Sequence, residues 1–121
     1  MRTLSESIIG RRGGAYKSSK TPGDLYPGQD LEYGDVVVSN GINTYYICLP
    51  TKQCIKWWGK YAGPNAQTVL IRYSSSNVCQ ACYTCDLTRN YEFVRYISEY
   101  RNIKTPEDLK TVFDKYNIPY E

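Results

Sequence analysis

The sequence predicts a small α+β protein, with an antiparallel sheet of three to four strands, open or partly closed into a barrel, followed by two helices. Two β-rich runs lie on either side of Asn40-Gly41, and a further apolar run, QTVLIRY, occupies residues 67–73. In the C-terminal third, the apolar residues change from alternating to helical spacing. An extended N-terminal arm precedes the sheet.

The composition fits one globular domain and excludes several kinds of chemistry. The chain has 121 residues, 41% of them hydrophobic and 22% charged, which is enough for a modest core. It has no apolar run long enough to cross a bilayer and no signal-peptide core at its N-terminus, so we expect no membrane association. The absence of histidine excludes histidine-based catalysis and histidine metal ligands. Since no Asp/Glu pair stands in a recognisable catalytic context, we expect that the protein is not an enzyme.

Residues 1–27 are predicted to form a flexible basic arm, and residues 28–121 a single globular domain. Three apolar residues near the start share one helical face, but the segment is too short to be a stable helix alone. Two arginines follow, and the rest of the arm is rich in glycine, serine and proline. We expect the arm to bind another protein chain through Leu4, Ile8, Ile9, Arg11 and Arg12.

Asn40-Gly41 predicts a two-residue type I′ hairpin loop, because both residues tolerate a positive φ. Such a loop would pair Val38 with Asn43 and Val36 with Tyr45. Side chains alternate between the faces of a strand, so one face is predicted to enter the core. That face carries Val36, Val38, Tyr45 and Ile47, whereas the other has mixed polarity and could be half solvated.

The remaining elements follow in order. Residues 52–58 are predicted to form a third strand, and residues 67–73 a fourth. A stripe of apolar residues then predicts a helix over 88–101, formed by Phe93, Val94, Ile97 and Tyr100. Thr105 is the expected N-cap of the last helix, with Pro106 in the first helical position. The apolar stripe of that helix consists of Leu109, Val112, Phe113 and Tyr116.

The cysteines allow a metal site. Three of the five lie in the run CQACYTC, and two-residue spacing lets thiolates converge on one zinc ion, which accepts four sulfurs. The alternative is a set of reduced, half-buried thiols, for which no cofactor is needed. We expect no cofactor and keep zinc as the alternative, with the candidate ligands Cys54, Cys79, Cys82 and Cys85.

Aromatic residues are the compositional oddity, with thirteen tyrosines and two adjacent tryptophans. Tyrosine supplies a large, stiff contact area with a polar tip, which suits binding surfaces as well as half-buried strands. Neighbouring residues on a strand point to opposite faces, so one tryptophan would face solvent if the other filled the core. The candidate binding platform consists of Tyr33, Tyr46, Trp57, Trp58 and Tyr61.

Two resemblances follow from these residues. The pattern Tyr33-x-Gly-Asp-Val-Val-Val-x-Asn-Gly, then Tyr45-Tyr46 and later Trp57-Trp58, resembles small aromatic carbohydrate-binding modules of the chitin-binding type, which recur in phage tail and fibre proteins. It implies that Tyr46 and either Trp57 or Trp58 face a sugar. The N-terminal LSESIIGRRGG is similar to short N-terminal peptides on proteins of large tailed phages that infect gut bacteria, which implies a viral particle.

The sequence is therefore interpreted as a non-enzymatic structural or accessory protein that binds other protein chains in a tailed-phage particle. We expect it in the virion, or in the host cytoplasm during assembly. One alternative is a carbohydrate-binding module with a glycan as its partner. The other is a zinc-stabilised cytoplasmic regulator that binds a host protein or nucleic acid. Nucleic acid is the less favoured partner, because the second predicted helix, the candidate for reading DNA, is as acidic as it is basic.

Overall fold

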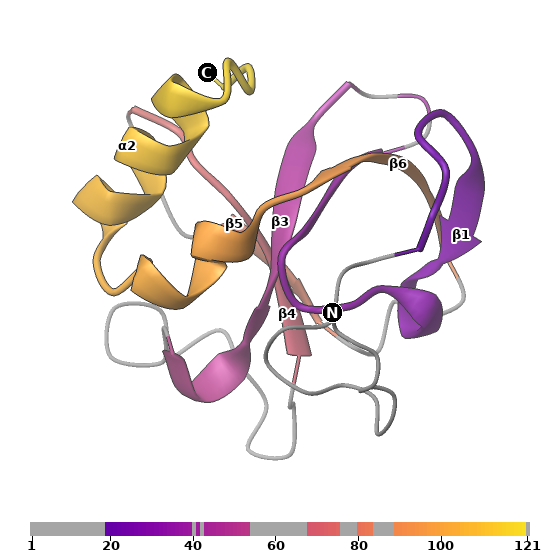
Figure 1. Ribbon diagram of the computed structural model, residues 1–121, viewed down its shortest axis with the longest axis horizontal. Helices are drawn as coiled ribbons and strands as arrows, with labels where there is room; N and C mark the ends of the chain where they lie inside the picture. The colour runs from indigo at the N-terminus through magenta and orange to yellow at the C-terminus, as the bar shows by residue number, and fades with distance from the viewer. Residues whose placement is uncertain are drawn as a thin grey trace.

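The computed structural model describes residues 19–39, 41, 43–53, 68–75, 80–83 and 89–120, and for 80–83 it describes only the backbone. This part of the chain is an α+β structure in which helical segments pack on one antiparallel sheet (Figure 1). The apolar end of the predicted arm, most of the predicted third strand and both tryptophans lie outside the described residues. No helix within the described ranges is long and apolar enough to cross a membrane.

The sheet is larger than predicted and has six strands instead of three to four. Its strands are β1 (Leu25–Pro27), β2 (Asp35–Ser39), β3 (Tyr45–Pro50), β4 (Thr68–Arg72), β5 (Gln80–Tyr83) and β6 (Asn90–Tyr96). They pair in the order β1-β6-β2-β3-β4-β5, and every pair is antiparallel. The described strands thus form an open sheet with β1 and β5 at its edges, not a partly closed barrel.

The predicted hairpin forms, but with a longer loop. Val36 pairs with Ile47 and Val38 with Tyr45, and the Ser39 amide donates to the Thr44 carbonyl at 2.9 Å. Four residues, 40–43, therefore connect the strands, and the prediction of a two-residue loop is wrong. Within the described part of this loop, Gly41 and Asn43 have positive φ angles of 95° and 57°, whereas Asn40 lies outside the described residues.

The prediction of which hairpin face enters the core is still correct, because moving the register by two residues leaves every side chain on its original face. On that face, strands β2, β3 and β4 meet the helical segments η4 (Ser98–Asn102) and α2 (Pro106–Lys115), which Figure 1 shows together on one side of the sheet. The side chains that meet there form one cluster, whose fully buried members include Val36, Ile47, Ile71, Leu109 and Phe113. We call this cluster the helix-side core.

The opposite face is also buried, so the expectation that it is half solvated is wrong. A second core, which we call the back core, contains Leu31, Val37, Tyr46, Cys48, Leu70, Tyr91 and Phe93. Leu31 reaches it from the segment after the 3-10 turn η1 (Gly28–Asp30), and Tyr26 of β1 packs against it. The sheet therefore has apolar side chains on both faces, which explains why β2 is buried along its whole length.

Residues 90–96 form strand β6, where the sequence predicted the first half of a helix, and this prediction is wrong. In the pairing with β2, Val36 faces Arg95 but Val37 faces Phe93, so Val94 is an extra residue in a β-bulge. The bulge moves the alternation by one position and produces helix-like spacing of apolar residues. Only Ser98–Asn102 is helical in this region, as the 3-10 segment η4.

The last helix matches its prediction closely. The Thr105 hydroxyl oxygen accepts a hydrogen bond from the Asp108 amide at 3.1 Å, and Pro106 occupies the first turn. Leu109, Val112 and Phe113 are buried on the predicted stripe, with Tyr116 packed beside them. The two C-terminal helices that were expected are thus one 3-10 segment and one α-helix.

Two further segments differ from expectation. Residues 51–53 are helical and do not begin a third strand, and the Gln53 side-chain amide donates to the backbone carbonyls of Tyr100 and Ile103. Residues 25–27, which were assigned to the arm, form β1, and just before this strand the Gly23 amide donates to the Phe93 carbonyl at 2.9 Å. Residues 1–18 lie outside the described residues, so a flexible arm there stays a prediction.

Candidate functional site

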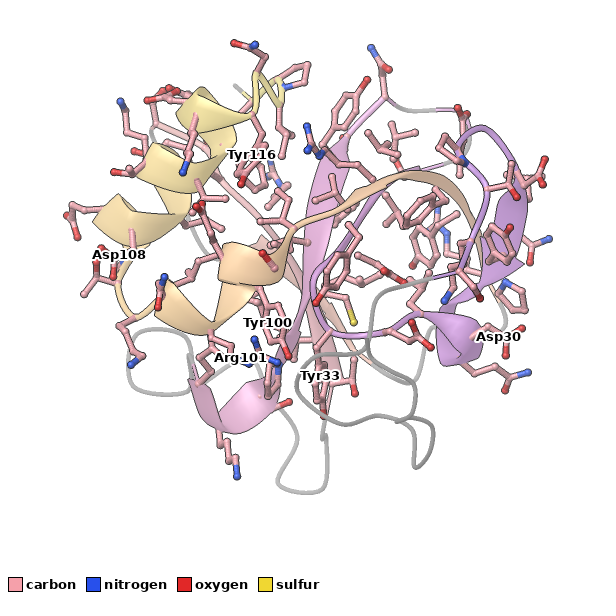
Figure 2. All side chains as sticks on the ribbon, viewed as in Figure 1. Asp30, Tyr33, Tyr100, Arg101, Asp108 and Tyr116 are labelled. Atoms are coloured by element: carbon pink, nitrogen blue, oxygen red, sulfur yellow. The ribbon has the colours of Figure 1, made fainter. Side chains whose placement is uncertain are left out.

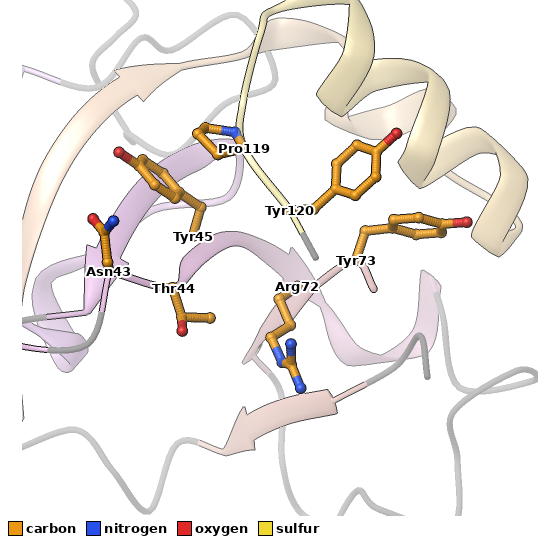
Figure 3. Close-up of a pocket in the computed structure, with 7 residues that line it drawn as sticks. All are labelled: Asn43, Thr44, Tyr45, Arg72, Tyr73, Pro119 and Tyr120. Carbon is orange, nitrogen blue, oxygen red and sulfur yellow. The ribbon is translucent and has the colours of Figure 1, made fainter. Parts of the chain in front are cut away.

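Two surfaces of the described structure combine exposed aromatic rings with charged or polar groups. The first is a pocket where the start of β3, the end of β4 and the C-terminal tail meet (Figure 3). Its volume is about 160 Å³. We call it the tyrosine pocket, and it is lined by Asn43, Thr44, Tyr45, Arg72, Tyr73, Pro119 and Tyr120.

The wall of the tyrosine pocket is held by a short hydrogen-bond chain on α2. The Tyr120 hydroxyl donates to Asp114 Oδ1 at 2.8 Å, and Lys110 Nζ donates to Asp114 Oδ2 at 3.0 Å. The hydrogen bond to Asp114 raises the pKa of Tyr120, so the phenol stays protonated at neutral pH. The Tyr73 and Tyr120 rings pack edge to face with centroids 4.9 Å apart. The C-terminal tail is therefore fixed against the sheet on one side and against α2 on the other.

The second surface surrounds Tyr33, in the turn that leads into β2. Tyr33 is 39% exposed, and its ring centroid lies 6.3 Å from that of Tyr100, which in turn lies 6.5 Å from that of Tyr96. The Arg101 guanidinium lies over the Tyr100 ring at 5.0 Å, within cation–π range. We call these four residues the Tyr33 patch; Figure 2 shows Tyr33, Tyr100 and Arg101 close together.

A close crossing of backbones positions the Tyr33 patch. The Gly34 amide donates to the Cys48 carbonyl and the Gly34 carbonyl accepts from the Ile97 amide, both at 2.8 Å. Gly34 has a φ of 96°, and a Cβ there would lie 2.8 Å from the Ile97 carbonyl oxygen and from the rings of Tyr96 and Tyr100. Only glycine fits this position, because it has no Cβ and adopts positive φ readily.

A buried ion pair lies at the base of the same turn. Lys20 Nζ is 3.3 Å from Asp35 Oδ2 and 3.8 Å from Glu32 Oε1, and Asp35 is fully buried. The same Asp35 oxygen accepts a hydrogen bond from the Glu32 amide at 2.8 Å, which closes the turn around Tyr33. Burial raises the pKa of the neighbouring Tyr96, and its interaction with Tyr100 adds to the shift. Tyr96 is therefore a neutral phenol at physiological pH.

The residues predicted to bind partners differ in where the structure places them. Tyr33 is exposed, whereas Tyr46 is only 9% exposed and packs against Tyr91 in the back core with ring centroids 6.4 Å apart. The other predicted residues, Leu4, Ile8, Ile9, Arg11, Arg12, Trp57, Trp58 and Tyr61, lie outside the described residues. Tyr33 and Tyr46 do not form one exposed platform, because the Tyr46 side chain is buried in the back core.

The zinc prediction also falls outside the described side chains. Cys54, Cys79 and Cys85 lie in undescribed segments, and for Cys82 only the backbone in β5 is described. Cys48 is not part of a disulfide and is fully buried in the back core. Among the described residues, no group of three or more histidine, cysteine or acidic residues is placed to hold a metal ion.

Sequence reasoning missed every residue of the tyrosine pocket and three of the four residues in the Tyr33 patch. The pocket joins 43–45, 72–73 and 119–120, which are distant in the sequence and meet only through strand pairing and the return of the tail. The excess of tyrosine was a signal for some aromatic surface. It did not indicate which tyrosines gather there.

Chemically, both surfaces suit binding. Tyrosine and arginine are enriched at binding surfaces because they offer a large contact area together with hydrogen-bond donors. Comparison with known protein families, with curated protein sequences and with solved structures finds no significant match to this chain.

Proposed function

We propose that the protein is a non-enzymatic accessory protein that binds another protein chain of an assembly through the Tyr33 patch. The observation that carries this proposal is the contact of the 39% exposed Tyr33 ring with Tyr100, next to the exposed Arg101. Residues that contribute most to protein–protein binding are typically tyrosine, tryptophan and arginine in a rigid setting.

The setting of the patch is rigid for three reasons. The Gly34 crossing ties it to β3 and to the end of β6, and the Lys20–Asp35 pair anchors the turn from below. The Gln53 side chain holds the backbone of η4, on which Tyr100 and Arg101 lie. A preorganised surface loses less conformational entropy when it binds, so more of the contact energy appears as affinity.

The resemblance of the N-terminus supports a tailed-phage particle as the assembly, and the predicted arm would supply a second contact with it. Two linked contacts bind more tightly than either one alone, because the second becomes intramolecular. The carbohydrate and zinc alternatives depend on residues outside the described part of the chain or, for Tyr46, on a buried ring.

The test is co-sedimentation of the full-length protein with large particles from cells that produce it together with its natural assembly. Replacing both Tyr33 and Arg101 by alanine should lower the co-sedimenting fraction by about tenfold or more, the loss expected for central interface residues. Tyr120→Ala is the matched control, since Tyr120 is 36% exposed and lies in the tyrosine pocket. It should leave sedimentation unchanged.

Both variants should keep a melting temperature close to that of the wild-type protein, because Tyr33, Arg101 and Tyr120 lie at the surface and belong to neither buried core. If the doubly substituted protein sediments with the particles at the wild-type level, the Tyr33 patch is not the docking surface. If the wild-type protein never sediments with particles, the accessory function itself is wrong.

A further inference from the structure

We infer that the tyrosine pocket is a separate binding site that takes one pyranose sugar ring, as a free monosaccharide or at the end of a glycan. The inference does not depend on the Tyr33 patch, since the two surfaces share no residue. Its three supports are the size of the pocket, the arrangement of its rings and the chemistry of its lining.

The size of the pocket limits the ligand to a single ring. Its volume of about 160 Å³ is close to that of an engineered cavity of about 150 Å³ that binds benzene. Sites for nucleotides, cofactors and drug-sized molecules measure about 300–1,000 Å³. A six-membered ring with its substituents directed toward the mouth therefore fits, whereas a larger ligand would lie mostly outside.

The aromatic rings surround this space instead of forming a flat surface. In Figure 3, Tyr45 lies on one side and Tyr73 and Tyr120 on the other, with Pro119 above and Thr44 and Arg72 below. The edge-to-face packing of Tyr73 and Tyr120, with centroids 4.9 Å apart, and the hydrogen bond from Tyr120 to Asp114 fix one wall before any ligand enters. Sugar rings present C–H groups on their faces, and these pack against aromatic rings.

The lining also carries polar groups at nearly every position, since six of its seven residues have a hydrogen-bonding side chain. An apolar ring, such as a proline or phenylalanine side chain of a partner, would displace water from the polar groups other than the Tyr120 hydroxyl, which already donates to Asp114, without replacing the hydrogen bonds of that water, which is unfavourable. A sugar replaces them, because hydroxyl groups surround its apolar faces. The observations therefore favour a sugar over an apolar side chain.

Arg72 adds a charge preference. This residue lines the pocket from the end of β4, and arginine forms short, directional hydrogen bonds with carboxylates. We therefore expect that a sugar acid binds more tightly than the corresponding neutral sugar, and that this difference decreases with added salt.

The experiment is a titration of the ¹⁵N-labelled full-length protein followed by NMR. The probes are methyl glycosides of glucose, galactose, mannose and N-acetylglucosamine, together with glucuronic acid and, as the competing occupant, N-acetylproline methylamide. At least one sugar should cause saturable shifts of the amides of residues 43–45 and 72–73, with a dissociation constant of about 1 mM, as expected for a ligand of one ring. Glucuronic acid should bind more tightly than methyl glucoside.

Tyr120→Ala should weaken this binding about tenfold, the contribution of one aromatic contact. Tyr33→Ala, which removes a similarly exposed tyrosine from the other surface, should not change it. The site is refuted if no sugar in the panel causes saturable shifts, if the shifts are unchanged in Tyr120→Ala, or if only the proline compound binds. Changes at Tyr120 should thus affect sugar binding and not sedimentation, whereas changes in the Tyr33 patch should affect sedimentation and not sugar binding. A failure of one proposal is therefore distinguishable from a failure of the other.

Discussion

Gly34 lies where three segments of the chain meet: the turn before β2, the end of β3 and the start of η4. Its backbone forms hydrogen bonds to Cys48 and Ile97, and its φ of 96° belongs to a region that other residues adopt with strain. At the scale of single residues, it therefore controls both the path of the backbone and the position of Tyr33.

Gly34→Ala should destabilise the protein by about 2–5 kcal/mol, the sum of backbone strain and overpacking against Ile97, Tyr96 and Tyr100. Gly41→Ala is the matched control, because its φ is 95° but no atom of the described residues lies within 4 Å of the added Cβ. This control should lower the free energy of unfolding by only about 1–2 kcal/mol, the contribution of backbone strain alone. Urea denaturation of both variants measures the difference. Equal losses would mean that the crossing at Gly34 is looser than described.

Among the elements, α2 is the one whose sequence explains its structure most directly. The Thr105 cap satisfies an otherwise unpaired amide, Glu107 and Asp108 lie in the first turn, and Lys115 lies in the last. Arg95 of β6 lies over the Tyr116 ring at 4.4 Å, and Lys115 pairs with Glu99, so the end of the helix is tied to the sheet and to η4.

Thr105→Ala should lower the free energy of unfolding by about 1 kcal/mol, because it removes the acceptor for the Asp108 amide. Thr111→Ala provides the comparison within the same helix. The Thr111 hydroxyl only donates to the Glu107 carbonyl, which is already part of the helix, so this change should stay within about 0.5 kcal/mol. Thermal melts followed by circular dichroism test both. A neutral Thr105→Ala would show that the cap is not needed.

At the scale of the whole molecule, one sheet carries two cores. Ile47 lies in the helix-side core and Phe93 in the back core, and neighbouring residues of β2 pair with each of them. The two cores therefore share the same strands, and neither can be lost without exposing apolar side chains on those strands to water. This arrangement predicts a single cooperative unfolding transition.

Ile47→Ala should lower the free energy of unfolding by about 2–5 kcal/mol and Phe93→Ala by about 3–5 kcal/mol, the usual range for large-to-small changes in a core. In each variant, near-ultraviolet and far-ultraviolet circular dichroism should report the same midpoint in urea. Leu25→Ala serves as the control, since Leu25 is 51% exposed on β1 and should change stability by no more than about 0.5 kcal/mol. Separate midpoints in Phe93→Ala would show that the back core unfolds independently.

The sequence by itself determined the elements whose signals are local. The cap and stripe of α2 depend on residues within one helix, and the apolar run of β4 is a strand in any register. The buried face of the hairpin was also predictable. A register error of two residues does not move a side chain to the other face, so Val36 and Ile47 enter the core as expected.

Tertiary structure alone decided the rest. The bulge at Val94 exists because β6 must pair with β2, and without that partner the spacing of Phe93, Val94 and Ile97 is indistinguishable from a helix. The back core depends on a cover formed by Leu31 and Tyr26, which buries Tyr46 and removes it from the predicted platform. In the tyrosine pocket, the start of β3 and the end of β4 meet the tail that follows α2. Contacts between such distant residues depend on chain path and strand order, which leave no local pattern in the sequence.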